Sequence, residues 1–224
     1  MKEREIGLDA LRGLAVFFML VFHLAVDLED FFGFRIGYRQ GAWQLLRCAI
    51  AAAFLLVSGY AAGAGLNRHI VKNGCKLLAA ALVVSVSTYF FDEHTYVRFG
   101  ILHLLACATL LTLFFQRLSS VQLFFLAIIF LVLGNYLENI SVTTELLLPL
   151  GLTPEKFLTL DYYPLLPWLA VFLGGIILGR NKKLPASEKS CICLRVLAFV
   201  GRHALFIYLV HQPLFLLSLT LLLG

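Results

Sequence analysis

The strongest constraint on the fold of this chain is a succession of apolar stretches, each about as long as a membrane-spanning helix. They occupy residues 7–28, 42–66, 70–91, 99–117, 120–138, 163–180 and 195–222. Only 14% of the 224 residues are charged, and the mean hydropathy is +0.90. A chain with so few polar residues cannot cover itself in water. We therefore predict an all-α integral membrane protein, with residues 1–224 forming a single bundle of about seven transmembrane helices.

The distribution of basic residues predicts how the bundle is oriented. If the N-terminus is cytoplasmic, 13 of the 18 Lys and Arg residues lie on the cytoplasmic side, and this asymmetry is typical of membrane proteins. The 13 are Lys2, Arg4, Arg12, Arg68, Lys72, Lys76, Arg117, Arg180, Lys182, Lys183, Lys189, Arg195 and Arg202. We expect a multi-pass protein of the cell membrane. The asymmetry explains most of the net charge of +5, so the charge gives no reason to expect a nucleic-acid partner.

Two further patterns favour packing or inert roles. The five cysteines include only a lone C-x-C at Cys191 and Cys193, without a second ligand pair nearby, and we expect no metal. Gly59 and Gly63 are four residues apart, so they share one face of a helix on which a neighbouring helix can pack closely. The segment 139–162 is only half apolar, and the sequence allows a surface helix or a re-entrant one.

The first apolar stretch carries ionisable residues along one helical face. At about 100° per residue, Asp9, Arg12, His23 and Asp27 project within one sector. Asp9 precedes Arg12 by one turn and can pair with it. Asp27 follows His23 by one turn and can orient the imidazole. Because charged groups are costly in lipid, we expect this face to point into the bundle or a wet cavity, although ion pairs that only fix the helix are an alternative.

Five segments, in this order, carry a family resemblance: "LDALRGLAVFFMLVFHLAVDL", "FLLVSGYAAG", "FGILHLLA", "DYYPLLPW" and "GRHALFIYLVHQP". The first contains an R-x10-H spacing, Arg12 and His23, similar to the first-helix signature of acyltransferase family 3 and related membrane acyltransferases. Together the five segments resemble the bacterial heparan-alpha-glucosaminide N-acetyltransferase catalytic-domain family over nearly the whole chain.

The resemblance implies an enzyme that moves an acetyl or other acyl group from cytoplasmic acyl-CoA to an acceptor on the opposite face, such as a cell-envelope sugar or glycan. His23 would act as a general base or carry the acyl group, and Asp27 would fix its tautomer. Arg12, roughly 16 Å from His23 along the helix axis, would hold a phosphate of the coenzyme. Arg68, Lys72 and Lys76 would add to a phosphate-binding rim; the alternative is that they only follow the positive-inside distribution of basic residues. The acceptor, the acyl-chain length and a homo-oligomeric state are left open.

Four other polar residues complete the predicted site. His103 and His211 are expected at a depth similar to His23, and Gln212 follows His211. Asp161 precedes the sixth stretch and would either bind the acceptor or cap that helix. We predict a polar cavity lined by His23, His103, Asp161 and His211, with His103 and Gln212 contacting the acceptor. A structural hydrogen bond is the alternative role for His211.

Two other functions are compatible with the same residues. A transporter or proton-linked carrier would use the His/Asp face as a relay, and a noncatalytic membrane partner would keep only the fold. The R-x10-H spacing and the four other segments favour the acyltransferase.

Overall fold

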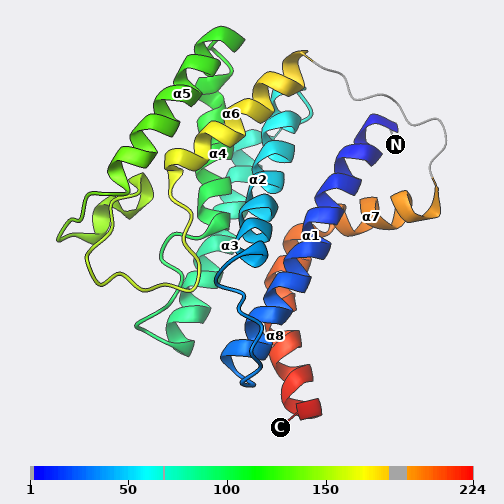
Figure 1. Cartoon of the computed structure of the whole chain (residues 1–224). Helices are drawn as coiled ribbons and strands as arrows, with labels where there is room; N and C mark the ends of the chain where they lie inside the picture. Colours follow the sequence, from blue (N-terminus) through cyan, green and yellow to red (C-terminus); the bar gives the residue numbers. More distant parts are fainter. Residues whose placement is uncertain (1–2, 68, 182–190, 224) are drawn as a thin grey trace. The chain divides into compact units, whose positions relative to one another are not determined.

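A computed structural model describes residues 3–67, 69–181 and 191–223 of the chain (Figure 1). The described residues form eight α-helices and one 3-10 helix, and they contain no strand. In chain order these elements are α1 (Glu3–Asp30), α2 (Ala42–Gly63), α3 (Ile70–Phe91), α4 (Ile101–Phe115), α5 (Ser120–Leu137), η1 (Glu145–Leu150), α6 (Leu165–Asn181), α7 (Ile192–Arg202) and α8 (Ala204–Leu223).

The length and composition of these helices confirm the predicted fold class. Five stretches are long and apolar enough to cross a bilayer: Ile6–Asp30, Ala42–Gly63, Ile70–Phe91, Ser120–Leu137 and Ala204–Leu223. Helices α4 and α6 are apolar but shorter. The segment 139–162, which the sequence left undecided, contains the short helix η1 and is otherwise irregular where it is described.

The last predicted stretch, 195–222, is not one helix. Helix α7 ends at Arg202, and α8 begins at Ala204. Between them His203 leaves helical geometry, with φ −99° and ψ 13°, and its Nδ1 lies 2.9 Å from the carbonyl oxygen of Phe199. The sequence interpretation missed this break because apolar residues stand on both sides of it. The prediction of a single helix is therefore wrong, and only α8 has the length and composition of a span.

The described residues fall into two compact units. The terminal unit combines Met1–Val57 with Leu184–Gly224, and the central unit is Ser58–Lys183. The prediction that the whole chain forms one domain stays a prediction.

In the terminal unit, α1 packs against α7 and α8. The contact with α7 depends on two glycines. A Cβ atom on Gly13 would collide with the carbonyl oxygen of Leu197, and one on Gly201 would collide with that of Asp9. The backbones of α1 and α7 therefore touch, as is common where small residues line a membrane helix interface.

In the central unit, α4 packs against α3 and α6, and α5 packs against α6. The last turns of α2 also lie close to α6. A Cβ on Gly59 or Gly63 would collide with the carbonyl oxygens of Phe172 and Ile176, and one on Gly179 with that of Tyr60. This confirms the prediction that Gly59 and Gly63 form a close-packing helix face.

The two ends of α4 are held by side chains of opposite charge. At its N-terminus Asp161 Oδ2 accepts a hydrogen bond from the backbone N–H of Ile101 at 2.9 Å. Past its C-terminus Arg180 donates to the carbonyl oxygens of Leu118 at 2.6 Å and Phe115 at 3.0 Å. Both charges complement the helix dipole and satisfy groups that the helix leaves unpaired.

The loops before α4 and before α6 are joined through their backbones. The N–H of Leu160 donates to the carbonyl of Thr95 at 2.7 Å, and that of Tyr163 donates to Phe99 at 3.0 Å. These contacts fix the chain around Asp161, so the carboxylate that caps α4 is carried by a loop tied to the start of the same helix.

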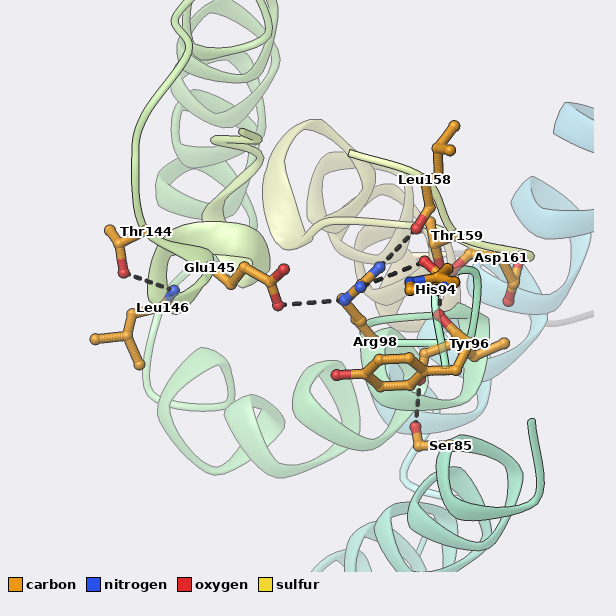
Figure 2. A network of polar contacts seen from close by, with 11 residues as sticks. Ser85, His94, Tyr96, Arg98, Thr144, Glu145, Leu146, Leu158, Thr159 and Asp161 are labelled. Atoms are coloured by element: carbon orange, nitrogen blue, oxygen red, sulfur yellow. Dashed lines mark hydrogen bonds and ion pairs between the residues drawn. The ribbon is translucent and has the colours of Figure 1, made fainter. Parts of the chain in front are cut away.

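Arg98 strengthens this junction (Figure 2). Its Nη1 donates to the carbonyl oxygen of Leu158 at 2.6 Å, and its Nε lies 3.2 Å from a carboxylate oxygen of Glu145. Its guanidinium also lies over the ring of Tyr96, 4.5 Å from the centroid. One arginine thus links η1 to both loops.

Candidate functional site

The ionisable face of α1 lies against α7 and α8 within the terminal unit. Near the start of α1, Arg12 Nη1 is 2.8 Å from Asp9 Oδ1, which confirms the predicted ion pair. The backbone of Asp9 is also the place where α7 approaches most closely, at Gly201. Arg12 is therefore held by a carboxylate one turn away and lies beside the α1–α7 crossing.

His23 is fixed by its own helix. Its Nδ1 lies 2.9 Å from the carbonyl oxygen of Met19, one turn earlier. A carbonyl oxygen can only accept a hydrogen bond, so the neutral imidazole carries its proton on Nδ1. The lone pair is therefore on Nε2, the nitrogen that can take a proton or attack a carbonyl carbon.

His211 on α8 repeats the arrangement of His23. Its Nδ1 lies 2.7 Å from the carbonyl oxygen of Tyr208, which places the lone pair on Nε2 by the same reasoning. The rings of His23 and His211 meet edge to face, with centroids 4.7 Å apart and planes at 79°. Two histidines that were predicted to line the site are thus brought together from helices at opposite ends of the sequence.

Asp27 does not orient His23, contrary to the prediction. Its Oδ1 accepts a short hydrogen bond from Gln212 Nε2, across 185 residues of sequence, while the carbonyl of Met19 orients His23. The side chain of Asp27 is completely buried. Helical spacing placed Asp27 on the correct face but could not identify its partner on α8. Gln212, predicted to contact the acceptor, therefore anchors the buried carboxylate.

Three buried atoms of this helix pair have no hydrogen-bond partner. They are Asp27 Oδ2, His211 Nε2 and Gln212 Oε1, and we call them the lone-pair cluster. An unsatisfied buried polar atom costs roughly 1–3 kcal/mol of stability. All three atoms belong to residues on the two contacting helices α1 and α8.

Aromatic rings surround the two histidines. The centroid of Phe22 lies 5.8 Å from that of His23, and those of Tyr208 and Phe215 lie 5.7 and 5.9 Å from that of His211. These rings pack against the imidazoles. Aromatic residues are common throughout the chain, so no sequence pattern distinguished these three.

His103 lies in the central unit, and both of its ring nitrogens have partners. Nδ1 accepts from the N–H of Gly100 at 3.2 Å, which leaves the proton on Nε2, 3.4 Å from Ser85 Oγ. Ser85 in turn donates to the carbonyl of Val97 at 2.6 Å. These contacts favour a structural role at the start of α4 over contact with an acceptor.

Asp161 also lies in the central unit, where it caps α4. Its Oδ2 binds the N–H of Ile101, 60 residues earlier. The two roles predicted from the sequence, contact with the acceptor and a cap for the helix that directly follows Asp161, stay predictions. Since His103 and Asp161 belong to one unit and His23 and His211 to the other, the predicted four-residue cavity stays a prediction.

Of the predicted coenzyme-binding residues, Arg12 and Lys72 are described and Arg68 lies outside the described residues. Lys72 is exposed in the first turn of α3. Arg12 is partly exposed, and a phosphate would share its guanidinium with Asp9. Both side chains are cationic, but Arg12 belongs to the terminal unit and Lys72 to the central unit. Their binding of the coenzyme stays a prediction.

Sequence reasoning missed the two backbone carbonyls that set the histidine tautomers. Met19 and Tyr208 precede their histidines by four and three residues. That spacing allows a side chain on a helix to reach back to the carbonyl, but nothing in the sequence reports the rotamer that does so. Among the described residues, no group of three His, Cys, Asp or Glu side chains is arranged to hold a metal ion.

Comparison with known proteins gives one result. The family model described as "Heparan-alpha-glucosaminide N-acetyltransferase, catalytic" matches residues 4–213. No curated protein and no solved structure matches the chain. The matched segment contains α1, α2, α3, α4, α5 and α6, together with α7 and the histidine-bearing half of α8. Since the match covers nearly the whole sequence, the chain belongs to the heparan-alpha-glucosaminide N-acetyltransferase catalytic-domain family.

Proposed function

We propose that this protein is a multi-pass enzyme of the cell membrane that transfers an acetyl group from cytoplasmic acetyl-CoA to a sugar or glycan on the opposite side. Its family is named for an acetyltransferase, and five of its helices are suited to span a bilayer. The proposal places the N-terminus in the cytoplasm, in keeping with the distribution of basic residues.

One observation carries the proposal: the Nδ1 of His23 is engaged by the Met19 carbonyl, while Nε2 remains as the basic nitrogen. A general base must present its lone pair in a fixed direction to the proton that it removes. The backbone carbonyl supplies this orientation without a second ionised group in the membrane. The adjacent ring of His211 restricts the imidazole on one side.

In the proposed reaction, His23 Nε2 accepts a proton from the acceptor amine or hydroxyl as that group attacks the thioester carbonyl. The new C–N or C–O bond forms, the C–S bond breaks, and CoA leaves as its thiolate. An acyl-imidazole on Nε2 is the alternative route, in which His23 attacks the thioester first. Both routes use the same nitrogen.

The coenzyme would approach from the cytoplasmic end of α1. Arg12 is 11 residues before His23, which is roughly 16 Å along a helix. This separation suits a phosphate held near the membrane surface and a thioester held deeper in the bilayer.

The test uses purified protein in lipid nanodiscs with radiolabelled acetyl-CoA and D-glucosamine. We expect His23→Ala to reduce acetyl transfer by about 100-fold or more, which is the usual contribution of a general base, while CoA binding is retained. His94→Ala is the matched control, because His94 is an exposed histidine outside the spans, and it should transfer at the wild-type rate. Full activity in His23→Ala would contradict the proposal.

A further inference from the structure

We infer that α7 is an interfacial helix, which lies along the surface of the bilayer and binds the headgroups of anionic phospholipids. The inference concerns how the protein meets the membrane, and it does not depend on the reaction proposed above. It follows from the length of α7, from the side chains on its faces and from the place where it contacts α1.

Helix α7 is too short to cross a membrane. It contains 11 residues, which extend over roughly 16 Å at 1.5 Å per residue, whereas the hydrocarbon core of a bilayer is about 30 Å thick. The chain leaves helical geometry at His203 before α8 begins, so α7 is not the first part of a longer span. Figure 1 shows α7 lying across α1, while α8 runs in a different direction.

One face of α7 is apolar and exposed. Ile192, Val196 and Phe199 are spaced by four and three residues, so they share one side of the helix. They are 81%, 58% and 57% exposed. Ala198 and Gly201 lie on another side and are buried, and Gly201 is the point of closest approach to α1. The exposed apolar face therefore points away from α1 and is free to enter the acyl chains of the bilayer.

Two arginines border this apolar face. At about 100° per residue, Arg195 and Arg202 project roughly 60° and 80° from Ile192, on the same side of it, and both are exposed. The sequence of α7 contains no acidic residue. The stem of an arginine can lie along apolar surface while its guanidinium reaches a phosphate in the headgroup layer. An apolar face flanked by arginines is typical of helices that bind an anionic membrane surface.

The contact with α1 indicates the depth of α7. Its backbone touches α1 at Asp9 and Gly13, which follow the start of the candidate span at Ile6 by three and seven residues. These positions are roughly 5 and 10 Å from that end of the span at 1.5 Å per residue. An interfacial helix buries its apolar face about 5–10 Å into the boundary between headgroups and acyl chains. The crossing therefore lies at the depth that such a helix occupies.

Charge complementarity identifies the class of lipid. The proposed topology places this end of α1 at the cytoplasmic leaflet, where anionic lipids attract basic segments. A zwitterionic headgroup balances its phosphate with its own cation, whereas an anionic headgroup leaves a net negative charge for Arg195 and Arg202. We therefore expect α7 to gather phosphatidylglycerol in preference to phosphatidylcholine.

The depth of α7 can be measured by tryptophan fluorescence of the full-length protein in lipid nanodiscs. Phe199→Trp keeps an aromatic ring on the apolar face, and the emission of Trp43 and Trp168 is subtracted with wild-type protein. The lipids carry bromine, a quencher, either near the headgroup end of the acyl chains or near their terminal methyl group. Leu214→Trp is the matched control, because Leu214 is exposed in the middle of the span-length helix α8.

We expect bromine near the headgroups to quench Phe199→Trp at least about twofold more than bromine near the methyl ends, as the depth of an interfacial helix requires. Leu214→Trp should show the reverse order. Val196→Trp serves if Phe199→Trp does not fold. Stronger quenching of Phe199→Trp by the deep bromine, or no quenching by either lipid, would overturn the inference, and the second result would show that protein or water covers this face.

The lipid preference is measured with Phe199→Trp in nanodiscs made of equal amounts of phosphatidylglycerol and phosphatidylcholine. Only one of the two lipids is brominated at a time, so the quenching reports which lipid gathers around α7. We expect stronger quenching by brominated phosphatidylglycerol, and a preference that weakens as salt screens the charges.

Adding Arg195→Gln should reduce this preference about two- to fivefold, as the loss of one arginine beside an anionic surface predicts. Arg39→Gln is the matched control and should leave the preference unchanged, because Arg39 is an exposed arginine that pairs with Asp30 at the other end of α1. Equal quenching by the two lipids, or a preference that Arg195→Gln leaves intact, would overturn the assignment of α7 as a site for anionic lipids.

Discussion

His103 and His211 are both buried histidines in apolar helices, yet their nitrogens are used in opposite ways. The Nδ1 of His103 accepts a hydrogen bond from a backbone N–H, whereas the Nδ1 of His211 faces a backbone carbonyl and must donate. The first arrangement completes the start of a helix, and both ring nitrogens are engaged. The second leaves the Nε2 lone pair of His211 with no partner, and a free lone pair is what a histidine needs to accept a proton.

This difference predicts that His103→Ala reduces stability and leaves catalysis unchanged. The N–H of Gly100 would lose its acceptor, and a buried unpaired group costs about 1–3 kcal/mol. Chemical unfolding in detergent should show that loss, while the KM for the acceptor stays within about twofold of wild type. His94→Ala, at an exposed histidine, should alter stability by less than about 0.5 kcal/mol. A large rise in KM with unchanged stability would instead support contact with the acceptor.

Tyr162 gives a prediction for alkaline pH. Its hydroxyl donates to the carbonyl of Leu148 at 2.8 Å, and burial raises the pKa of Tyr162 to about 12. Since the folded pKa lies above the unfolded value of about 10, the contribution of this group is complete below pH 10. It is lost as the pH rises from about 10 to about 12.

The measurement is the difference in tyrosinate absorbance between wild type and Tyr162→Phe during an alkaline titration, together with unfolding at pH 9 and pH 11. The difference spectrum should titrate near pH 12, and Tyr162→Phe should lose less stability than wild type between the two pH values. A difference spectrum with its midpoint near pH 10 would show that the hydroxyl is not shielded in this way.

At the scale of helices, α1 and α7 cross closely near Arg12. The part of the ionisable face of α1 that carries Arg12 therefore lies against α7. Gly13 and Gly201 each sit where a side chain would strike a backbone carbonyl. Because these contacts are between backbones, neither helix can adjust by changing a rotamer. The crossing therefore requires glycine at both positions.

We expect Gly13→Ala to destabilise the protein by about 1–3 kcal/mol, as overpacking of a tight interface usually does. Gly174→Ala is the matched control, because a Cβ on this glycine of α6 meets nothing within 4 Å. There the replacement should be neutral or stabilising, since alanine favours a helix more than glycine does. The thermal unfolding temperatures of both variants are compared in the same detergent. Equal stabilities of the two variants would contradict the close crossing of α1 and α7.

The sequence was sufficient to predict most of the helices and insufficient to predict their ends. Apolar length identified α1–α6, and the spacing of Gly59 and Gly63 predicted a close contact that α6 provides. Hydropathy does not register a change in backbone direction inside an apolar run. The break at His203, which separates α7 from α8, was therefore missed.

At the scale of the whole molecule, the proposed topology can be tested with cysteines. Cys191 and Cys193 are exposed at the start of α7, which the proposal places in the cytoplasm. A membrane-impermeant maleimide should label them in permeabilised cells and not in intact ones. Lys156→Cys, in a variant with Cys191 and Cys193 replaced by serine, should be labelled in intact cells. The reverse labelling pattern would show that the protein has the opposite orientation, with its N-terminus outside the cytoplasm.

The candidate site shows where prediction from a single sequence ends. Periodicity places Asp9, Arg12, His23 and Asp27 on one face of α1, because those positions depend only on helix geometry. The partners of Asp27 and Asp161 lie 185 and 60 residues away in the sequence. Such pairings are set by how helices and loops meet, so no local pattern could identify Gln212 or the N-terminus of α4 as the partner.

The backbone carbonyls beneath His23 and His211 also limit how protons can travel. In a chain of imidazoles that conducts protons, each ring accepts a proton at one nitrogen and releases a proton from the other. Each ring must then rotate before it can carry the next proton. Here one nitrogen of each ring is tethered to its own helix, so a proton that arrives at Nε2 has to depart by the same route. Each of these histidines can accept a proton at Nε2 during one catalytic cycle and release it again from Nε2. This behaviour suits a transferase better than a proton-driven carrier.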